Sequence, residues 1–590
     1  MEKWTVANKK ADFNAWSEQF HISPVLARII RNRDVLTTEE VEAFLHGELS
    51  DCPSPFLLKD MDRAVVSIQQ AISEHIAIRV IGDYDVDGIC ASYILTKGLR
   101  LLGAQVSTVI PHRVHDGYGL SNSLIEQASA EGVGMIVTCD NGIAAAAQIE
   151  LANSLGISVV VTDHHEVPFE ASEDAVNGRR QILPPALAVV DPKRDDCEYP
   201  FPEICGGLVA FKCIQALNSQ MTQKLPDAVI EELLEFAALA TVCDVMPLKG
   251  ENRIIVKEGL KRMRHSANLG LEALMRMHQI EPERLNTYHL GFVIGPCLNA
   301  TGRLDTAYRS LELLFSENNV EAMSCARELK ELNDSRKNLT QIGVEEAEKY
   351  ILEHGIQNDT VMLIYCPGVH ESLAGIVASR LKEKYYRPVF VLTKGEEGVK
   401  GSGRSIEGYH MYEKMCEVSG LFTKFGGHAM AAGLSTKEED IEFLRKALNQ
   451  KANLSEEDFV ERVQIDVPMP LGYADLTLAE QLTLLEPYGV GNPKPLFAEK
   501  NVLFISGRKL GANQNVGKYQ VQTLDGKRGN IMYFGNLEKF DVYLDEKFGV
   551  GSATALYRGQ GQYELALTYQ LGINEFRGNV ELRYVMQNYQ

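Results

Sequence analysis

The stretch IAIRVIGDYDVDG, from Ile76 to Gly88, joins an apolar, β-branched run to a turn that carries three aspartates. The runs 134–138 and 157–161 repeat this unit with Ala/Leu-rich helical stretches between them, and 187–190 is a fourth candidate strand. Near-continuous apolar strands that alternate with helices are typical of a parallel sheet covered on both faces. The sequence therefore predicts an α/β fold, and such sheets bind ligands beyond the carboxyl ends of their strands.

Three further segments follow this sheet. From Val320 to His354, apolar residues recur at three-, four- or seven-residue steps without proline, which predicts a long helix that connects two lobes. A second α/β unit follows, from Thr360 to about Leu448, and contains two Gly-rich loops. From about Glu461 apolar and polar residues alternate in short runs, and this period predicts an antiparallel β-domain such as a small barrel.

The composition excludes several classes of protein. With 590 residues, 45% hydrophobic and 24% charged, the chain is a globular protein of several domains rather than a collagen, a coiled coil or a disordered chain. Its 11 cysteines are scattered without a CxxC pair, so we expect a reduced, cytoplasmic protein. No apolar run approaches the length that crosses a bilayer, and we therefore expect no membrane insertion.

The charge is unevenly distributed. A net charge of −21 should repel nucleic acid, so any polyanion site must be a local groove or carry metal. The segment from Lys500 to Gln590 differs, because it holds 11 basic and 8 acidic residues. A polyanion is therefore tolerated best at the C-terminal domain.

Acidic side chains and histidines follow three of the predicted strands. They are Asp83, Asp85 and Asp87 after the first strand, Asp140 after the second, and Asp163-His164-His165 after the third, with Asp244 further along. Carboxylates that converge at one sheet edge repel each other unless a cation neutralises them. Asp with a minority of His is a ligand set that suits Mg²⁺ and Mn²⁺, so we predict a site for two divalent ions. The alternative, that each aspartate merely caps a helix, requires three coincidences.

These motifs resemble those of a known superfamily. Asp85-Val86-Asp87, Asp140, Asp163-His164-His165 and Asp244 match the four motifs of the DHH phosphoesterases. The stretches GPCLNATGRL at 295–304, DGYG at 116–119 and LLEPYGVGNP at 484–493 look like the RecJ subgroup. The resemblance implies a single-stranded-DNA-specific 5′-to-3′ exonuclease that acts in DNA repair and recombination with two divalent ions, Mn²⁺ or Mg²⁺.

The resemblance also implies roles for individual residues. The metal ligands would be Asp85, Asp87, Asp140, His164 and Asp244, and Asp83 would be either a ligand or a residue behind the ligands. His165 would face the scissile phosphate. The substrate contacts would come from Arg113, Tyr118, Asn299, Arg303, His370, Ser402, Arg404, Gly426, Gly427 and His428. Cys297 stands where relatives commonly carry Arg, which puts one phosphate contact in doubt.

A bilobed architecture with an appended barrel is implied in the same way. We expect an N-terminal helical segment (1–55), a parallel-sheet DHH domain (56–319), a connecting helix (320–354), a smaller α/β DHHA1 domain (355–450) and an OB-fold (460–580). An OB-fold would bind single strands by stacking and backbone charge. In the expected mechanism, two ions activate the attacking water and stabilise the leaving oxygen of a phosphodiester.

The expected partner is single-stranded DNA, in particular a strand with a 5′ phosphate. The chain would act as a monomer, beside a single-strand-binding protein or a helicase. Two alternatives share part of the pattern. A DHH phosphodiesterase of short oligonucleotides or cyclic dinucleotides would have the ligands but little use for a barrel, and a non-catalytic DHH scaffold of a replication complex would typically have lost ligands.

Overall fold

The computed structural model describes residues 2–113, 119–171, 178–395, 398–576 and 578–590. These residues form two compact units. The first unit holds residues 53–246 and 258–461, and the second holds residues 2–52, 247–257 and 462–590. The two ends of the described chain thus belong to the same unit.

Five strands form the sheet of the first lobe of unit one. In spatial order they are β3 (Val106–Val109), β2 (Ile78–Ile81), β4 (Met135–Cys139), β5 (Ser158–Thr162) and β8 (Ala188–Val190). Every pairing among them is parallel, which confirms the predicted sheet. Strands β2 and β4 are buried along their whole length, because helices cover both faces of the sheet.

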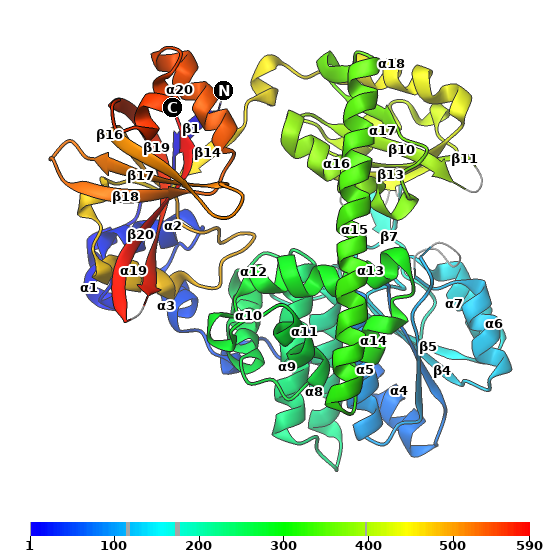
Figure 1. Cartoon of the computed structure of the whole chain (residues 1–590). Helices are drawn as coiled ribbons and strands as arrows, with labels where there is room; N and C mark the ends of the chain where they lie inside the picture. Colours follow the sequence, from blue (N-terminus) through cyan, green and yellow to red (C-terminus); the bar gives the residue numbers. More distant parts are fainter. Residues whose placement is uncertain (1, 114–118, 172–177, 396–397, 577) are drawn as a thin grey trace. The chain divides into compact units, whose positions relative to one another are not determined.

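Helices pack on the two faces of this sheet (Figure 1). On one face α6 (Asn122–Ala130) and α7 (Ala146–Ser154) bury their apolar residues against the strands. The other face is covered by α4 (Met61–Ser73), α5 (Val86–Leu101) and α8 (Gly206–Gln220), and α9 (Asp227–Cys243) packs on α5 and α8. The lobe also contains the hairpin β6 (Phe169–Ala171) and β7 (Arg179–Gln181), and the helices α11 (Leu269–Met277), α12 (Thr287–His289), α13 (Gly295–Leu304) and α14 (Tyr308–Leu314).

The long helix α15 (Asn319–Glu353) joins the two lobes of unit one (Figure 1). It begins at Asn318, whose side chain accepts a hydrogen bond from the backbone N–H of Glu321 at 3.0 Å. It packs against α11, α13 and α14 of the first lobe and against α16 (Glu371–Tyr385) of the second. The predicted connecting helix is therefore present, within one residue of its expected ends.

The second lobe is a mixed α/β layer. Its strands lie in the order β12 (Lys424–Gly427), β13 (Ala431–Thr436), β11 (Gly398–Arg404), β10 (Val389–Gly395) and β9 (Met362–Tyr365). Only β9 and β10 pair in parallel, and the other pairings are antiparallel. Helices α16, α17 (Met411–Cys416) and α18 (Ile441–Lys451) complete this lobe.

Unit two contains a closed barrel. Its strands are β16 (Phe497–Leu510), β17 (Val516–Gln522), β18 (Arg528–Tyr533), β20 (Asn579–Tyr589) and β19 (Tyr563–Phe576), and β15 (Val467–Pro468) extends the sheet beside β16. Strand β19 pairs back onto β16, which closes the sheet and confirms the OB-type barrel. The barrel core buries the rings of Phe497, Phe504, Tyr519 and Tyr569. By contrast, Phe534 is exposed beneath the guanidinium of Arg583.

The N-terminal segment belongs to the barrel unit. It contains α1 (Phe13–Phe20), α2 (Pro24–Asn32), α3 (Thr38–His46) and a strand, β1 (Lys3–Val6), which pairs in parallel with β14 (Arg462–Ile465). The buried guanidinium of Arg33 binds the carboxylate of Asp466, with 2.6 Å between Nη1 and Oδ1. The remaining helices of the chain are α10 (Gly250–Met263), α19 (Leu476–Leu482), α20 (Leu537–Phe548) and α21 (Ser552–Tyr557).

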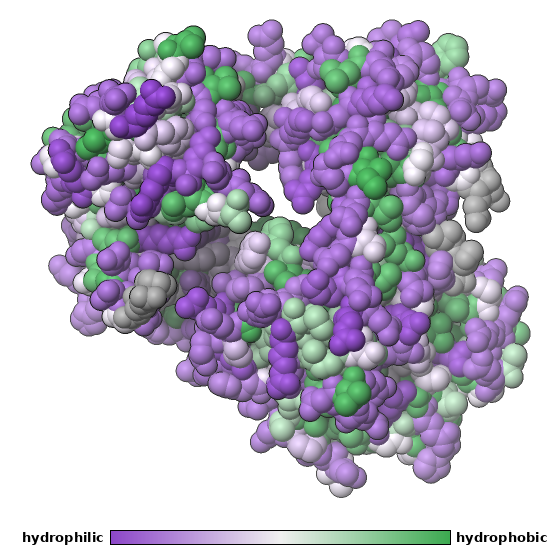
Figure 2. All heavy atoms as spheres, in the orientation of Figure 1, coloured by the Kyte–Doolittle hydropathy of each residue, from purple (hydrophilic) through white to green (hydrophobic). Residues whose placement is uncertain are grey.

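One face of the molecule is mostly polar. Figure 2 shows a face on which hydrophilic residues predominate and apolar residues are scattered. Among the described residues, no helix combines the length and the apolar character that a membrane span requires.

Candidate metal centre and substrate cleft

The predicted carboxylates meet at the carboxyl edge of the first sheet. Asp83 and Asp85 follow β2, Asp140 follows β4, and His164 follows β5. Parallel strands end at the same edge, so residues far apart in the sequence arrive together. Asp244 joins them from the end of α9, where it is the C-terminal cap residue.

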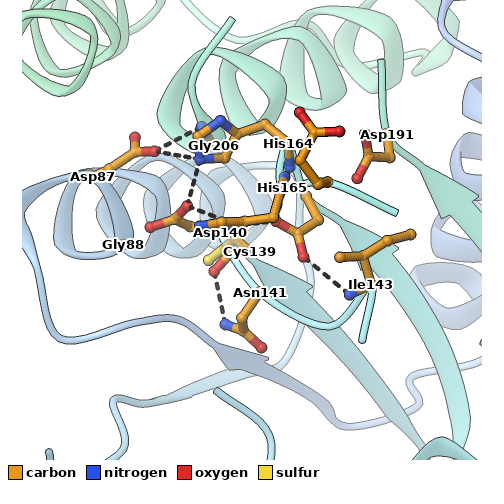
Figure 3. Close-up of polar contacts among 12 residues, drawn as sticks. Asp87, Gly88, Cys139, Asp140, Asn141, Ile143, His164, His165, Asp191 and Gly206 are labelled. Carbon is orange, nitrogen blue, oxygen red and sulfur yellow. Dashed lines mark hydrogen bonds and ion pairs between the residues drawn. The ribbon is translucent and has the colours of Figure 1, made fainter. Parts of the chain in front are cut away.

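Asp85 and Asp87 are each held by the start of a helix. Asp85 caps α5, because its carboxylate accepts a hydrogen bond from the N–H of Gly88 at 3.0 Å. Asp87, which is 2% exposed, accepts hydrogen bonds from the N–H groups of Gly206 and Gly207, both at 2.7 Å (Figure 3). The capping interpretation is therefore true of Asp85, yet it leaves the convergence of the other side chains unexplained.

Glycine is required at the start of α8. A Cβ atom on Gly206 would lie 2.6 Å from the Cβ of Asp140, and one on Gly207 would lie 2.6 Å from the Cβ of Ala240. Asp140 itself has a φ of 60°, a left-handed conformation that Asp adopts more readily than most residues. The first turn of α8 thus sets the positions of Asp87 and Asp140 together.

His164 lies between two of the carboxylates. Its Nε2 atom is 3.0 Å from Oδ1 of Asp140 and 3.4 Å from Oδ2 of Asp87 (Figure 3). The same atom is 3.7 Å from Oδ2 of Asp244. Burial lowers the pKa of His164 in spite of the charge of Asp87, which favours the neutral imidazole that a metal ligand requires.

The side chains form three overlapping groups whose ligand atoms lie within 4.8 Å of one another. The groups are Asp83 with Asp85 and Asp140, Asp87 with His164 and Asp244, and Asp140 with His164 and His165. Because Asp140 and His164 are shared, the three groups make one extended centre.

Burial and mutual repulsion oppose the ionisation of these carboxylates. Burial, followed by the charges of Asp87 and Asp85, raises the pKa of Asp140 well above its ordinary range. The same causes raise the pKa of Asp244 to about 9. Burial and the charge of Asp85 also raise the pKa of Asp83. A bound cation would lower these pKa values again, because it stabilises the ionised form of every ligand.

The residues fit a divalent metal centre. Oδ1 of Asp83 and Nδ1 of His164 are buried without a hydrogen-bond partner among the described residues. Buried polar atoms of native proteins are normally satisfied, so such atoms in a cluster of carboxylates indicate a ligand. Oxygen ligands with one or two imidazoles suit Mg²⁺ and Mn²⁺.

His165 and Asp163 form a pair beside the centre. Oδ1 of Asp163 lies 2.7 Å from Nδ1 of His165, and Oδ2 of Asp163 accepts a hydrogen bond from the N–H of Ile143 at 2.9 Å (Figure 3). Burial opposes the imidazolium, but the hydrogen bond that His165 donates to Asp163 raises the pKa of His165 to about 9. The contact with Asp163 therefore favours the imidazolium form of His165 in the metal-free protein.

Asp191 was not predicted from the sequence as part of the site. Asp191 follows β8 and is fully buried, and its Oδ1 accepts a hydrogen bond from the N–H of Lys193 at 2.8 Å. Burial and the charge of Asp163 raise the pKa of Asp191 to about 7. The signal was available, because an acid after the fourth strand continues the pattern of the first three.

Basic side chains from both lobes gather next to the carboxylates. The guanidinium of Arg113 lies 4.6 Å from the ring centre of Tyr84. Arg303, on α13, donates a hydrogen bond from Nη1 to the backbone oxygen of Ser372 in the second lobe at 2.7 Å. Burial is the largest cause that lowers the pKa of Arg303 to about 10, and the charge of Arg113 contributes. Burial and Arg113 also lower the pKa of Arg404. Guanidinium groups this close together favour an anionic ligand.

A cavity of about 480 Å³ lies between the lobes. The first lobe contributes Tyr84 and Arg113 to its lining. The second lobe contributes Ser372, Lys400, Ser402, Lys424 and Gly426, among others. Glu371 also lines the cavity, and its carboxylate pairs with Nζ of Lys400 at 2.9 Å. The other cations and the hydroxyl groups of the lining suit a phosphate.

Four predicted substrate residues, His370, Gly427, His428 and Asn299, are not among the residues that line this cavity. His370 caps α16, because its Nδ1 accepts a hydrogen bond from the N–H of Ser372. Gly427 and His428 are exposed at the end of β12, and Gly427 has a φ of 154° that suits glycine. Oδ1 of Asn299 is buried without a hydrogen-bond partner among the described residues. Tyr118 lies outside those residues.

Cys297 is buried against two polar side chains. Its buried Sγ lies 3.3 Å from Nδ2 of Asn333 and 3.2 Å from Nε2 of His278. Oδ1 of Asn333 in turn accepts a hydrogen bond from Nε of Arg336 at 3.0 Å. Arg336, on α15, is not among the predicted substrate residues.

Three family models match the chain. The DHH family, N-terminal domain, matches residues 77–241, the DHHA1 domain matches 358–454, and the RecJ OB domain matches 465–588. The first match contains four of the aspartates of the metal centre, and the third contains all strands of the barrel except the final residue of β20.

Curated relatives carry the name single-stranded-DNA-specific exonuclease RecJ. The protein of Bacillus subtilis is 36% identical over 527 residues, which are 88% of this chain and 64% of that protein. The protein of Salmonella typhimurium is 34% identical over 589 residues, which are 96% of each chain.

Solved structures agree with these relatives. RecJ of Thermus thermophilus in complex with Mn²⁺ has a TM-score of 0.80 at 26% identity, over 100% of this chain and 79% of that chain. The same protein in complex with Mg²⁺ has a TM-score of 0.75 at 25% identity, over 100% of this chain and 78% of that chain. Because the Salmonella relative matches almost the full length of both chains, this chain belongs to the RecJ family of DHH proteins.

Proposed function

We propose that this chain is an exonuclease that degrades single-stranded DNA from its 5′ end with two divalent ions, Mn²⁺ or Mg²⁺. One observation carries the proposal: a centre of five carboxylates and His164 lies in the same unit as a cavity lined by hydroxyl groups and cations. The first feature suits phosphodiester hydrolysis, and the second suits the anionic end of a strand.

The residues that would hold the ions are Asp83, Asp85, Asp87, Asp140, His164 and Asp244. When bound, two divalent ions supply Lewis acidity that lowers the pKa of the attacking water and stabilises the leaving oxygen. The chain fixes the ligands beforehand, because Asp85 is held by Gly88 and Asp87 by the N–H groups of α8. Such preorganisation reduces the cost of assembling the centre.

His165 would contact the scissile phosphate. Its side chain is 41% exposed, and the hydrogen bond that its Nδ1–H donates to Asp163 fixes its orientation. The other ring nitrogen, Nε2, then donates to a phosphate oxygen. An imidazolium in this position stabilises negative charge that develops in the transition state.

The arginines would select the 5′ end. After burial, the charge of Arg113 lowers the pKa of both Arg303 and Arg404, so the three guanidinium groups lie close together. A terminal phosphate carries more charge than an internal phosphodiester and can accept more hydrogen bonds, so this group of cations favours a 5′-phosphorylated end. Direction of degradation then follows from which end the cavity holds.

We assign the parts of the chain to separate tasks. Residues 56–319 would supply the metal ligands, 320–354 would join the lobes, 355–450 would bind the strand end, and 460–580 would hold the strand further along. The chain would act as a cytoplasmic monomer in DNA repair and recombination, on strands supplied by a helicase or coated by a single-strand-binding protein.

The test uses one oligonucleotide with a label at either end. With Mn²⁺, the 5′-labelled strand should release a labelled mononucleotide at once, whereas the 3′-labelled strand should shorten step by step. A blunt duplex of the same sequence is the control and should persist. The reverse order of release would contradict the direction, and cleavage confined to very short strands would instead support a phosphodiesterase of short oligonucleotides.

A further inference from the structure

Two aromatic rings lie stacked on the surface of the first lobe. The ring centres of Tyr288 and Phe292 are 5.3 Å apart with an interplanar angle of 22°. Tyr288 is 61% exposed and Phe292 is 71% exposed. Large rings normally bury most of their surface, so an exposed, mutually aligned pair indicates a ligand that covers them.

The rings stand on a π-helical turn. Residues Leu290–Ile294 form this turn between α12 and α13, so that one helical segment runs from 287 to 304. Such turns are rare and occur frequently at functional sites. The sequence prediction singled out 295–304 as a motif but did not include the turn that precedes it.

The π-helical turn packs on the end of α9, next to a metal ligand. Sγ of Cys243 lies 3.6 Å from the backbone oxygen of Leu290. A Cβ atom on Gly291 would lie 3.6 Å from Cγ1 of Val242. The next residue of the chain after Cys243 is Asp244, so the π-helical turn contacts the residue that precedes a metal ligand.

A stripe of side chains leads from the rings into the cleft. Its members are spaced by four, four, three and four residues, and they are Tyr288, Phe292, Pro296, Asn299 and Arg303. Residues at this spacing share one face of a helix. The stripe ends at Arg303, which donates a hydrogen bond to the backbone oxygen of Ser372 in the second lobe. After burial, the charges of Arg113 and Arg404 lower the pKa of Arg303, and Arg113 lines the cavity between the lobes.

The charge of this segment suits a polyanion. Between Leu285 and Leu304 the sequence contains no Asp or Glu, although the chain as a whole carries a net charge of −21. A strand could therefore follow the stripe without repulsion from carboxylates. Every base has a face that stacks on an aromatic ring, so such a contact would tolerate any sequence.

We propose that Tyr288 and Phe292 form a base-stacking platform for the part of the single strand that lies outside the cleft. This proposal rests on the proposed exonuclease function and adds a second contact to it. The eleven helical steps from Phe292 to Arg303 span about 16 Å at ~1.5 Å per residue, or roughly five nucleotides at the ~3.4 Å spacing of a stacked strand. Strands shorter than this should not reach the rings.

The test compares strands of different length. In EDTA, fluorescence anisotropy measures the dissociation constants of 5′-phosphorylated strands of about three and about twelve nucleotides. At ~3.4 Å per nucleotide the shorter strand is too short to reach the rings, and the longer strand is long enough. The double variant Tyr288→Ala/Phe292→Ala should bind the longer strand at least about fivefold more weakly, the lower end of base–aromatic stacking, and the shorter strand as the wild type does. Tyr288→Phe should bind both as the wild type does, because it keeps the ring. Tyr308→Ala, which removes another exposed ring of the same lobe, is the matched control.

A second arm tests whether bases contact the rings. A longer strand that lacks bases from about the fifth to the eighth position, where the ~3.4 Å spacing places the platform, should bind the wild type more weakly than an intact strand. It should bind the double variant no more weakly than an intact strand does. An undiminished effect of the missing bases in the variant, or full affinity of the variant for the longer strand, would overturn the platform. A wild type that neither binds the longer strand nor degrades it with Mn²⁺ would overturn the exonuclease proposal itself, and the platform with it.

Discussion

Nδ1 of His165 lies 2.7 Å from Oδ1 of Asp163, and this single contact sets the charge of the histidine that faces the metal centre. Asp163 is held in place from the other side by the N–H of Ile143. Although burial opposes it, the hydrogen bond and charge of His165 lower the pKa of Asp163, so the pair is ionic on both sides. Asp163, the first residue of the DHH motif, therefore acts by setting the charge of His165, the third.

In the metal-free protein, the stability of the fold and the titration of His165 should both depend on this contact. Because the folded pKa of His165 is about 9, above its ordinary ~6.5, proton binding stabilises the fold below pH ~6.5 and this stabilisation is lost as the pH rises through about 9. An NMR titration of the His165 ring should have a midpoint near 9. In Asp163→Asn the midpoint should fall to about 6.5 or below. An unchanged midpoint in this variant would show that Asp163 does not set the charge.

Replacing a buried carboxylate should have opposite effects with and without metal. Asp140→Asn removes repulsion from Asp87 and Asp85, so the melting temperature of the metal-free protein should rise. The rise in melting temperature on addition of Mn²⁺ should shrink, since binding at roughly 100 times the dissociation constant supplies about 2.7 kcal/mol only if the site is intact. Nuclease activity should fall by at least about a hundredfold, as expected when ~2.7 kcal/mol of transition-state stabilisation is lost. Asp195→Asn, at an exposed carboxylate of the same lobe, should change none of these quantities.

Substitution of Gly206, at the start of α8, should reduce activity as much as substitution of a metal ligand. Gly206→Ala would place a Cβ atom 2.6 Å from the Cβ of Asp140, so helix and ligand must move apart. We expect a loss of activity together with a lower melting temperature, of the order of 1–3 kcal/mol of unfolding free energy, as for other overpacked sites. Gly420→Ala is the matched control, because nothing lies within 4 Å of its added atom. Full activity of Gly206→Ala would show that the centre tolerates displacement of Asp140.

The arginine in the second lobe should discriminate between strand ends. Arg404→Ala should slow degradation of 5′-phosphorylated strands more than that of 5′-hydroxyl strands, because only the former lose a charge-assisted contact worth about 1.5–3 kcal/mol. Lys446→Ala removes an exposed cation from α18 of the same lobe and should slow neither. The measurement is kcat/KM for the two substrates. Equal losses on both would mean that Arg404 holds the strand backbone rather than its end.

Some features could be predicted from the sequence because they depend on local order. The parallel strands were visible as apolar runs, and the positions of Asp85, Asp140 and His164 after those runs were enough to bring them to one edge. The connecting helix was visible because its period persists over roughly ten turns. In each case the relevant information lies within a few residues of the element that carries it.

Other features depend on contacts between distant segments and were not predicted. The bond between Asp87 and the start of α8 joins residues 119 positions apart, and the pairing of β1 with β14 joins the N-terminal strand to the start of the C-terminal domain. The outward-facing aromatics of the barrel could not be read from alternation, because β16 changes register between Phe504 and Ser506. A bulge of this kind moves every later side chain to the opposite face.

The connecting helix α15 also constrains how this gene can vary. Each residue of an α-helix turns the following chain by about 100° and advances it by ~1.5 Å. A single insertion or deletion between Asn319 and Glu353 would therefore swing the second lobe around the helix axis, carrying Ser402 and Arg404 away from Arg303 and the carboxylates. Point substitutions on the exposed side of this helix should be tolerated freely, whereas changes in its length should abolish activity. Selection should therefore preserve the number of residues in the helix even where their identity varies.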